Sequence, residues 1–146
     1  MTNYELKDQP LEIQNILELL LLSVPKLTGA LLATTDGLPI AYKLERLDVE
    51  QISAMISTNV GLGKRIAASR GIDPMQAVIV QGAGGYLCMY SVGDRHVLAV
   101  EATQDASLGI IHITAQRFAL KITNQLLNLN TTLGTLAVFE DPWAVS

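Results

Sequence analysis

The sequence predicts an α+β domain in which helices cover both faces of one sheet. Three long stretches carry apolar residues spaced three and four apart, as one face of a helix requires. Between them lie short segments rich in β-branched residues, each bounded by Gly, Pro or Asp turns. These segments are apolar at consecutive positions, which is typical of strands covered on both faces. The predicted order is helix, two strands, helix, three strands, helix.

Composition limits the classes of function. A chain of 146 residues fits a single domain. Charged residues make up only 16%, against about 25% in an average soluble domain, so we expect part of the surface to be buried against another molecule. The net charge of −4 argues against nucleic-acid binding, because neutralising phosphates requires a basic face.

Cysteine use and hydropathy predict the compartment. Cys88 is the only cysteine, which excludes an intramolecular disulfide framework and fits a reducing environment. The most apolar run, 16–24, contains Glu18 and is far shorter than the ~20 residues a membrane span needs. It also lacks the basic flank and cleavage site of a signal peptide. We therefore expect a cytoplasmic protein without a membrane span.

The first third of the chain predicts a helix and a hairpin. The helix covers 10–23, and strands 28–35 and 38–44 meet at Asp36-Gly37, a signal for a two-residue turn with positive φ at both central positions. Pro39 cannot donate to a strand ladder, so the second strand should lie at a sheet edge or turn its missing N–H toward solvent. The inward stripe of the helix consists of Ile13, Ile16, Leu17, Leu20 and Val24.

The long helix 49–70 is the element on which we expect function to depend. Asp48 is its expected N-cap and Gly71 its stop. Its predicted inward stripe is Ile52, Met55, Ile56, Asn59, Gly63, Ile66 and Ala67. A second stripe, Ala54, Thr58, Gly61, Arg65 and Ala68, is small and weakly polar. Because a glycine inside a helix costs roughly 1 kcal/mol relative to Ala, we expect a second helix to approach this stripe closely.

The remaining chain predicts a meander, a helix and a tail. Strands are expected at 76–81, 86–92 and 96–101, followed by a helix at 107–128. The dense apolar strands favour a filled core over a ligand pocket. The predicted domain is 1–128, and 129–146 form a C-terminal tail. Its apolar part, 133–139, could dock as a strand or short helix anchored by Pro142 and Trp143, or it could be a frayed terminus.

Three segments carry a family resemblance. They are TGALLATTDGLPIAY (28–42), GGYLCMYSVGDRHVLAV (84–100) and SLGIIHITAQRFALKI (107–122). Together with the long helix they resemble the roadblock or dynein light chain family, which includes bacterial regulators of Ras-like GTPases. The positions that match best are Asp36-Gly37-Leu38-Pro39, Gly85, Gly93-Asp94 and Leu108-Gly109. No catalytic residue belongs to this pattern.

The resemblance implies a profilin-like fold and a dimer. The expected sheet has five antiparallel strands in the order 2-1-5-4-3, with the long helix on one face and the other two helices on the opposite face. Members of this family usually pair their third strands and their long helices. The unprotected apolar edge AVIV (77–80) agrees with such pairing. The expected dimer interface is Ala54, Thr58, Gly61, Arg65, Ala68, Ala77, Val78, Ile79 and Val80.

The sequence offers no convincing catalytic, cofactor or metal site. Gly61-Leu62-Gly63-Lys64 lacks the spacing of a phosphate-binding loop and lies within a helix. His96 and His112 have no Cys or carboxylate cluster at metal-ligand spacing. Cys88 lies in an apolar strand, which favours an inert core thiol. We therefore expect neither an enzyme nor a bound cofactor.

A basic cluster suggests where a partner binds. Lys64, Arg65 and Arg70 lie toward the end of the long helix in an otherwise acidic chain. They form either a solvated helix end or a contact with an acidic partner such as a GTPase. The resulting hypothesis is a homodimeric, non-catalytic module that binds and regulates a Ras-like small GTPase. The alternatives are a small-molecule sensor and a structural adaptor in a larger complex.

Overall fold

The computed structural model describes residues 10–45 and 48–140, with side chains through residue 128. The elements follow in the predicted order. They are α2 (Leu11–Ser23), β1 (Leu27–Thr34), β2 (Pro39–Lys43), α3 (Val49–Ser69), β3 (Val78–Gly82), β4 (Gly85–Val92), β5 (His96–Thr103) and α4 (Leu108–Glu140).

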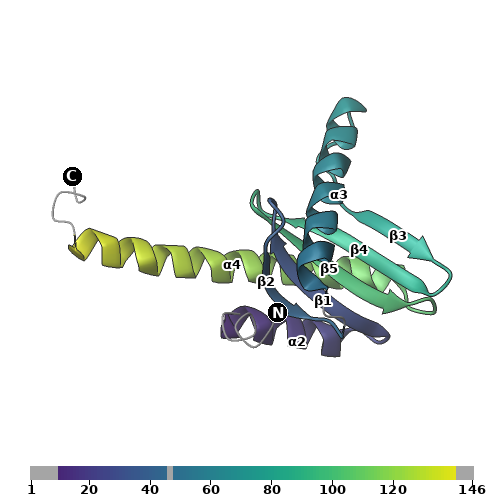
Figure 1. Ribbon diagram of the computed structural model, residues 1–146, viewed down its shortest axis with the longest axis horizontal. Coiled ribbons are helices and arrows are strands. Elements are labelled where there is room, and N and C mark those ends of the chain that lie inside the picture. Colours follow the sequence, from purple (N-terminus) through teal and green to yellow (C-terminus); the bar gives the residue numbers. More distant parts are fainter. Residues whose placement is uncertain (1–9, 46–47, 141–146) are drawn as a thin grey trace.

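One antiparallel sheet organises the domain. Its strand order is β2-β1-β5-β4-β3, which confirms the predicted fold. Helix α3 crosses one face, and α2 and α4 lie on the other (Figure 1). The edges are β2, which begins at Pro39, and β3. The edge position predicted from Pro39 is therefore confirmed.

Each face of the sheet has its own hydrophobic core. The larger core lies between the sheet and α2 and α4, and it includes Ile13, Leu17, Leu20, Tyr90, Leu98, Ile111, Phe118 and Ile122. The smaller core lies under α3 and consists of Leu31, Ala33, Val49, Ile56, Val60, Met89, Val97 and Ala99. Two cores explain why the strands are apolar at consecutive positions, since neighbouring strand residues point to opposite faces.

The β1–β2 connection differs from the predicted two-residue turn. The N–H of Gly37 donates to the carbonyl of Thr34 (3.0 Å), and the N–H of Thr34 donates to the carbonyl of Leu38 (2.8 Å). The loop therefore contains three residues. Gly37 has a φ of 97°, and Asp36 does not have a positive φ. A type I turn followed by a glycine bulge needs only one left-handed residue, which explains why the prediction of two was wrong.

Helix α3 begins and ends close to where it was predicted. Gly71 has a φ of 71°, and the N–H groups of Gly71 and Ile72 donate to the carbonyls of Ala68 (3.2 Å) and Ala67 (2.9 Å). These two bonds form a Schellman motif. At the start, Asp48 occupies the N-cap position, but its carboxylate makes no capping hydrogen bond within the described part of the chain. Asp48 is therefore the N-cap residue as predicted, but without the side-chain hydrogen bond typical of that position.

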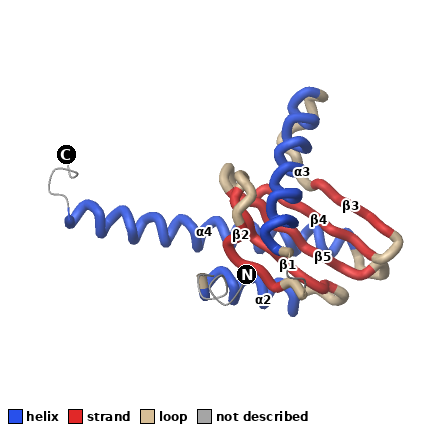
Figure 2. Tube along the Cα trace, viewed as in Figure 1, coloured by secondary structure: helices blue, strands red, loops and turns tan. Residues whose placement is uncertain are grey.

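Helix α4 is longer than predicted. The Ser107 hydroxyl accepts a hydrogen bond from the N–H of Ile110 (3.3 Å) at its start. The backbone then stays helical through Glu140 instead of ending at residue 128, and its second half extends beyond the sheet (Figure 2). Residues 129–140 thus continue α4 and form neither a strand nor a separate short helix. Pro142 and Trp143 lie outside the described residues, and the domain boundary at 128 stays a prediction.

An ion pair ties the α2–β1 turn to the β5–α4 turn. The Asp105 carboxylate accepts hydrogen bonds from Lys26 Nζ (2.6 Å) and Thr103 Oγ1 (2.5 Å). The Lys26 bond, followed by the Thr103 bond, lowers the pKa of Asp105 to about 2. A carboxylate whose pKa is lower in the folded state than in the unfolded state stabilises the fold above its unfolded pKa, and this contribution is lost as the pH falls toward the folded value.

This pair predicts a specific pH dependence. Asp105→Asn should lower the thermal midpoint at pH 7, and the gap from the unmodified protein should close as the pH falls from about 4 toward about 2. Thermal denaturation across this range, followed by circular dichroism, measures the gap. Asp94→Asn in the β4–β5 turn is the matched control. A gap that stays constant with pH would show that the Asp105 charge does not stabilise the fold.

Candidate interaction surface

The inner face of α3 combines small residues with β-branched apolar ones. Its buried residues are Val49, Ser53, Ile56, Ser57, Val60 and Ala67. The hydroxyl of Ser57 donates a hydrogen bond to the carbonyl of Thr34 (2.7 Å), the last residue of β1. The buried hydroxyl of Ser57 therefore has a partner. Ser53 is fully buried, and its hydroxyl has no partner among the described residues. Small side chains let the helix lie close to the sheet.

The predicted inward stripe of α3 is partly wrong. Ile56 and Ala67 are buried, and Ile52 and Gly63 are half-buried. Met55, Asn59 and Ile66 instead face outward and are exposed. The helix is rotated relative to the prediction because the sheet accepts serines where the sequence pattern favoured larger apolar residues.

The outer face of α3 joins a small stripe to an apolar one. All five residues of the predicted second stripe, Ala54, Thr58, Gly61, Arg65 and Ala68, are exposed. Beside them lie Met55 (52% exposed), Leu62 (53%) and Ile66 (53%). An apolar row next to a small-residue row is the kind of surface that admits a second helix at close distance.

The two glycines of α3 have different surroundings. A Cβ added at Gly63 would lie 2.7 Å from both Met75 Sδ and Val78 Cγ2, so Gly63 allows the helix to approach the start of β3. A Cβ at Gly61 would have nothing within 4 Å. The single chain therefore explains Gly63, while Gly61 faces open space.

These surroundings predict opposite results for two substitutions. Gly63→Ala should destabilise the fold by about 1 kcal/mol, because crowding against Val78 outweighs the gain in helix propensity. Gly61→Leu should stabilise a dissociated chain by up to ~1 kcal/mol but weaken any association through this face by about 1–3 kcal/mol. Urea unfolding at low and high protein concentration separates the two effects. Unchanged association of Gly61→Leu would place Gly61 outside any helix seam.

Strand β3 is an open apolar edge. It pairs only with β4 in the described chain. Ala77 and Val78 are half-buried, whereas Ile79 is 43% and Val80 51% exposed. Val80 pairs with Leu87 and Ile79 with Cys88, so these two side chains point to opposite faces. We call Met55, Leu62, Ile66, Ile79 and Val80 together the α3–β3 surface.

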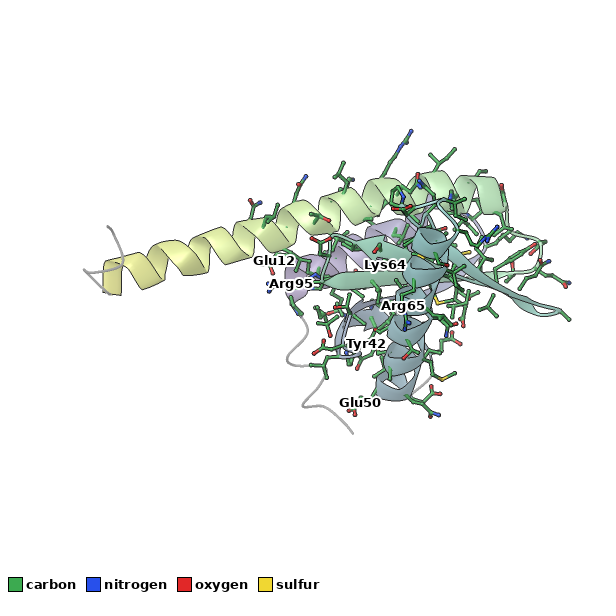
Figure 3. The ribbon with its side chains drawn as sticks, turned by 90° about the horizontal axis from the view of Figure 1, so that it is seen from above. Glu12, Tyr42, Glu50, Lys64, Arg65 and Arg95 are labelled. Carbon is green, nitrogen blue, oxygen red and sulfur yellow. The ribbon has the colours of Figure 1, made fainter. Side chains whose placement is uncertain are left out.

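The basic residues lie toward one end of this surface. Lys64 is half-buried, and Arg65 and Arg70 are exposed. Figure 3 shows Lys64 and Arg65 in the half of α3 that lies away from Glu50. The ion pairs of the described residues, Lys26–Asp105 and Lys43–Glu18, involve none of them. Their charges are therefore available to a partner.

Sequence reasoning missed a further basic residue, Arg95. Its carbonyl accepts a hydrogen bond from the N–H of Thr35 (2.9 Å), which brings the β4–β5 turn beside the β1–β2 turn. Ser57 of α3 donates a hydrogen bond to Thr34, the neighbour of Thr35 in the chain. Arg95 therefore lies at the end of the sheet that α3 contacts. In the sequence Arg95 lies in a predicted hairpin turn, and this position does not indicate that it lies near α3.

Burial is the main cause of the altered pKa values in the strands. Burial raises the pKa of the Cys88 thiol, which keeps it protonated. Burial, with a smaller effect of Cys88, also raises the pKa of Tyr90, whose hydroxyl lies 3.3 Å from Nδ1 of His112. Burial and then Arg95 lower the pKa of His96. Within the described residues, no group of three His, Cys, Asp or Glu could hold a metal ion, and no helix is long and apolar enough to cross a membrane.

Comparisons with known proteins agree with this architecture. Residues 13–102 match the model of the Roadblock/LC7 domain family. The chain is 34% identical over 95 residues to MJ1340 of Methanocaldococcus jannaschii, covering 64% of this chain and 82% of that protein. A second protein of the same organism, MJ0310, matches with the same identity and coverage.

Solved structures share the fold at low sequence identity. A Roadblock/LC7 domain from Streptomyces avermitilis matches with a TM-score of 0.73 and 22% identity, over 78% of this chain and 97% of its own. Myxococcus xanthus MglB matches with a TM-score of 0.74 and 20% identity, over 81% and 97%. Profilin IB from Acanthamoeba castellanii, at 0.58 and 12% over 77% and 97%, shows the same sheet in a more distant protein. Because the family model matches more than half of the sequence, the chain belongs to the Roadblock/LC7 domain family.

Proposed function

We propose that two copies of this chain associate through the α3–β3 surface and that the dimer is a non-catalytic platform for a cytoplasmic partner. The observation that supports this most is that exposed apolar residues occur both on the outer face of α3 and along the unpaired edge strand β3. An exposed apolar edge strand left unpaired in water would promote aggregation. Pairing two β3 strands in a symmetric dimer satisfies the edge and brings the two α3 helices together.

One protein that shares this fold forms an assembly of several copies. One MglB structure that this chain matches, with a TM-score of 0.70 and 19% identity, is described as a tetrameric arrangement. At this identity the likeness concerns the fold alone. Dimerisation of this chain rests on its own surface, namely Gly61 with open space around it and Val80 half exposed at the edge.

The proposed partner is a Ras-like small GTPase. Membership in the Roadblock/LC7 family supports this class of partner, because the family resemblance implies regulation of such GTPases. Lys64, Arg65 and Arg70 offer positive charge at one end of α3, which suits an acidic partner surface. A structural adaptor would use the same surface with another partner, and affinity capture followed by mass spectrometry distinguishes the two.

Charge reversal of Lys64 tests the partner contact. Lys64→Glu should weaken GTPase binding about tenfold at low salt, mainly through a slower association rate, and added salt should shrink the difference. Arg117→Glu, an exposed site on α4, is the matched control. Surface plasmon resonance measures both rates, and single-turnover GTP hydrolysis measures any effect on the nucleotide cycle.

Each outcome of this test is informative. Unchanged binding and turnover for Lys64→Glu would reduce the basic cluster to a solvated helix end. A loss shared equally by Arg117→Glu would show a general effect of net charge. Arg65 is a poorer probe, because it also lies in the small-residue stripe and its replacement could change dimerisation.

A further inference from the structure

The helix layer formed by α2 and α4 carries a second exposed apolar surface. The two helices pack side by side on the face of the sheet opposite α3 (Figure 1). Their buried residues face the sheet, and seven large apolar side chains on the outside are at least half exposed. We call these seven residues the α2–α4 surface: Leu11, Leu19, Leu22, Ile110, Ile113, Leu120 and Leu127.

Helical spacing places these side chains in rows. Ile113, Leu120 and Leu127 are seven residues apart, so they lie on one face of α4, about two turns from each other. In α2, Leu22 follows Leu11 by eleven residues, about three turns, and lies on the same side of the helix. Scattered apolar side chains are normal on a protein surface, but such rows on two neighbouring helices mark an interaction site.

The two helices carry opposite charges. Of Asp, Glu, Lys and Arg, α2 contains only Glu12 and Glu18, and α4 as far as residue 128 contains only Arg117 and Lys121. Glu18 forms an ion pair with Lys43 of β2 (2.8 Å). Glu12 and the two basic residues are exposed, and neither described ion pair involves them. The α2–α4 surface therefore has an acidic side along α2 and a basic side along α4.

We propose that the α2–α4 surface binds the same surface of a second copy of the chain, with α2 of each copy lying on α4 of the other. A two-fold axis parallel to the helices produces this arrangement, whereas an axis across them would place each helix on its own counterpart. The first arrangement brings acidic α2 onto basic α4, and the second opposes like charges. An anionic membrane fits less well, because it would require an excess of Lys and Arg on this face.

This contact is separate from the α3–β3 surface and does not depend on a GTPase. Helix α3 and the layer of α2 and α4 cover opposite faces of the sheet (Figure 1). Substitutions on the α2–α4 surface should therefore leave the dissociation constant of the α3–β3 dimer unchanged. A chain that uses both surfaces forms assemblies larger than a dimer.

Two substitutions, made singly and together, separate the two contacts. Leu62→Glu disrupts the α3–β3 surface, and Leu120→Glu places a carboxylate in the apolar row of α4. Sedimentation equilibrium over a range of concentrations measures the size of each assembly. We expect the unmodified chain to form species larger than a dimer, each single variant to form a dimer, and the double variant to stay monomeric.

The results distinguish failure of this proposal from failure of the α3–β3 dimer. A monomeric Leu62→Glu variant with a dimeric Leu120→Glu variant would overturn the α2–α4 contact and leave the α3–β3 dimer standing. A dimeric Leu62→Glu variant with a monomeric Leu120→Glu variant would support the α2–α4 contact and exclude the other. A Leu62→Glu variant that stays monomeric but binds vesicles of phosphatidylcholine and phosphatidylglycerol would assign the surface to lipid and overturn the proposal.

Controls are made in the Leu62→Glu background, where only the α2–α4 contact remains. Leu120→Glu should weaken this dimer at least about tenfold. Leu38→Glu, in the β1–β2 loop, should leave it unchanged, since Leu38 is 61% exposed against 64% for Leu120. Ile113→Glu repeats the test at a second site of the row if the Leu120→Glu chain does not fold. A loss equal to that of Leu38→Glu at both sites would overturn the proposal.

A charge swap in the same background tests the pairing of α2 with α4. Glu12→Lys and Arg117→Glu should each weaken the dimer about fivefold, because each opposes like charges across the interface. Combined, they exchange the signs of the two sides and should restore most of the affinity. Added salt should reduce all of these differences. Losses that multiply in the combined variant would overturn the placement of α2 on α4.

Discussion

Gly85→Ala is expected to lower the free energy of unfolding by about 2–4 kcal/mol, the largest effect expected of a methyl group added at any glycine whose surroundings the structure describes. Gly85 has a φ of 153°, where residues with a Cβ are strained. A Cβ built there would overlap the carbonyl oxygen of Ala102. That oxygen belongs to the backbone of β5, so relief requires the β4–β5 ladder to shift. Urea unfolding measures the loss.

Gly84→Ala is the control for this experiment. Gly84 precedes Gly85 in the same loop, and a Cβ at Gly84 would have nothing within 4 Å. We expect Gly84→Ala to change stability by less than about 0.5 kcal/mol. Equal losses for the two variants would show that loop entropy, and not the contact with Ala102, explains the requirement for glycine.

Leu62→Glu is expected to weaken self-association by at least about 2 kcal/mol, a factor of about 30 in the dissociation constant. Leu62 is 53% exposed beside the small-residue stripe of α3. In a symmetric dimer the substitution places two carboxylates in one apolar seam, and burying a charge without a partner is costly. Analytical ultracentrifugation over a range of concentrations measures the dissociation constant.

Leu22→Glu is the matched control. Leu22 lies on α2 and is 84% exposed, on the face of the sheet opposite α3. It should leave the dissociation constant unchanged. Thermal melts of both variants at a concentration where the chain is dissociated should be nearly the same, because both sites are solvated. A compact monomer for the unmodified chain at micromolar concentration would contradict dimerisation itself.

Local chemistry in the sequence determined much of the fold. Gly71 predicted the end of α3, since only a residue tolerant of positive φ closes the helix in this way. Pro39 predicted an edge strand because it lacks an N–H. Consecutive apolar residues in the strands predicted coverage of both faces. The strand order itself came from the family resemblance, because pairing between distant strands leaves no local signal.

Tertiary structure alone decided which face of α3 is buried. The sequence has apolar residues on adjacent stripes, so its periodicity was compatible with Met55 and Ile66 pointing inward. The sheet beneath α3 presents the carbonyl of Thr34 to Ser57 and small residues such as Ala99 to the helix. Serines could therefore be buried at a close helix–sheet contact, and the larger side chains of Met55, Leu62 and Ile66 turned outward. A helix rotates to the face that fits the opposing surface, and that surface is assembled from strands distant in the sequence.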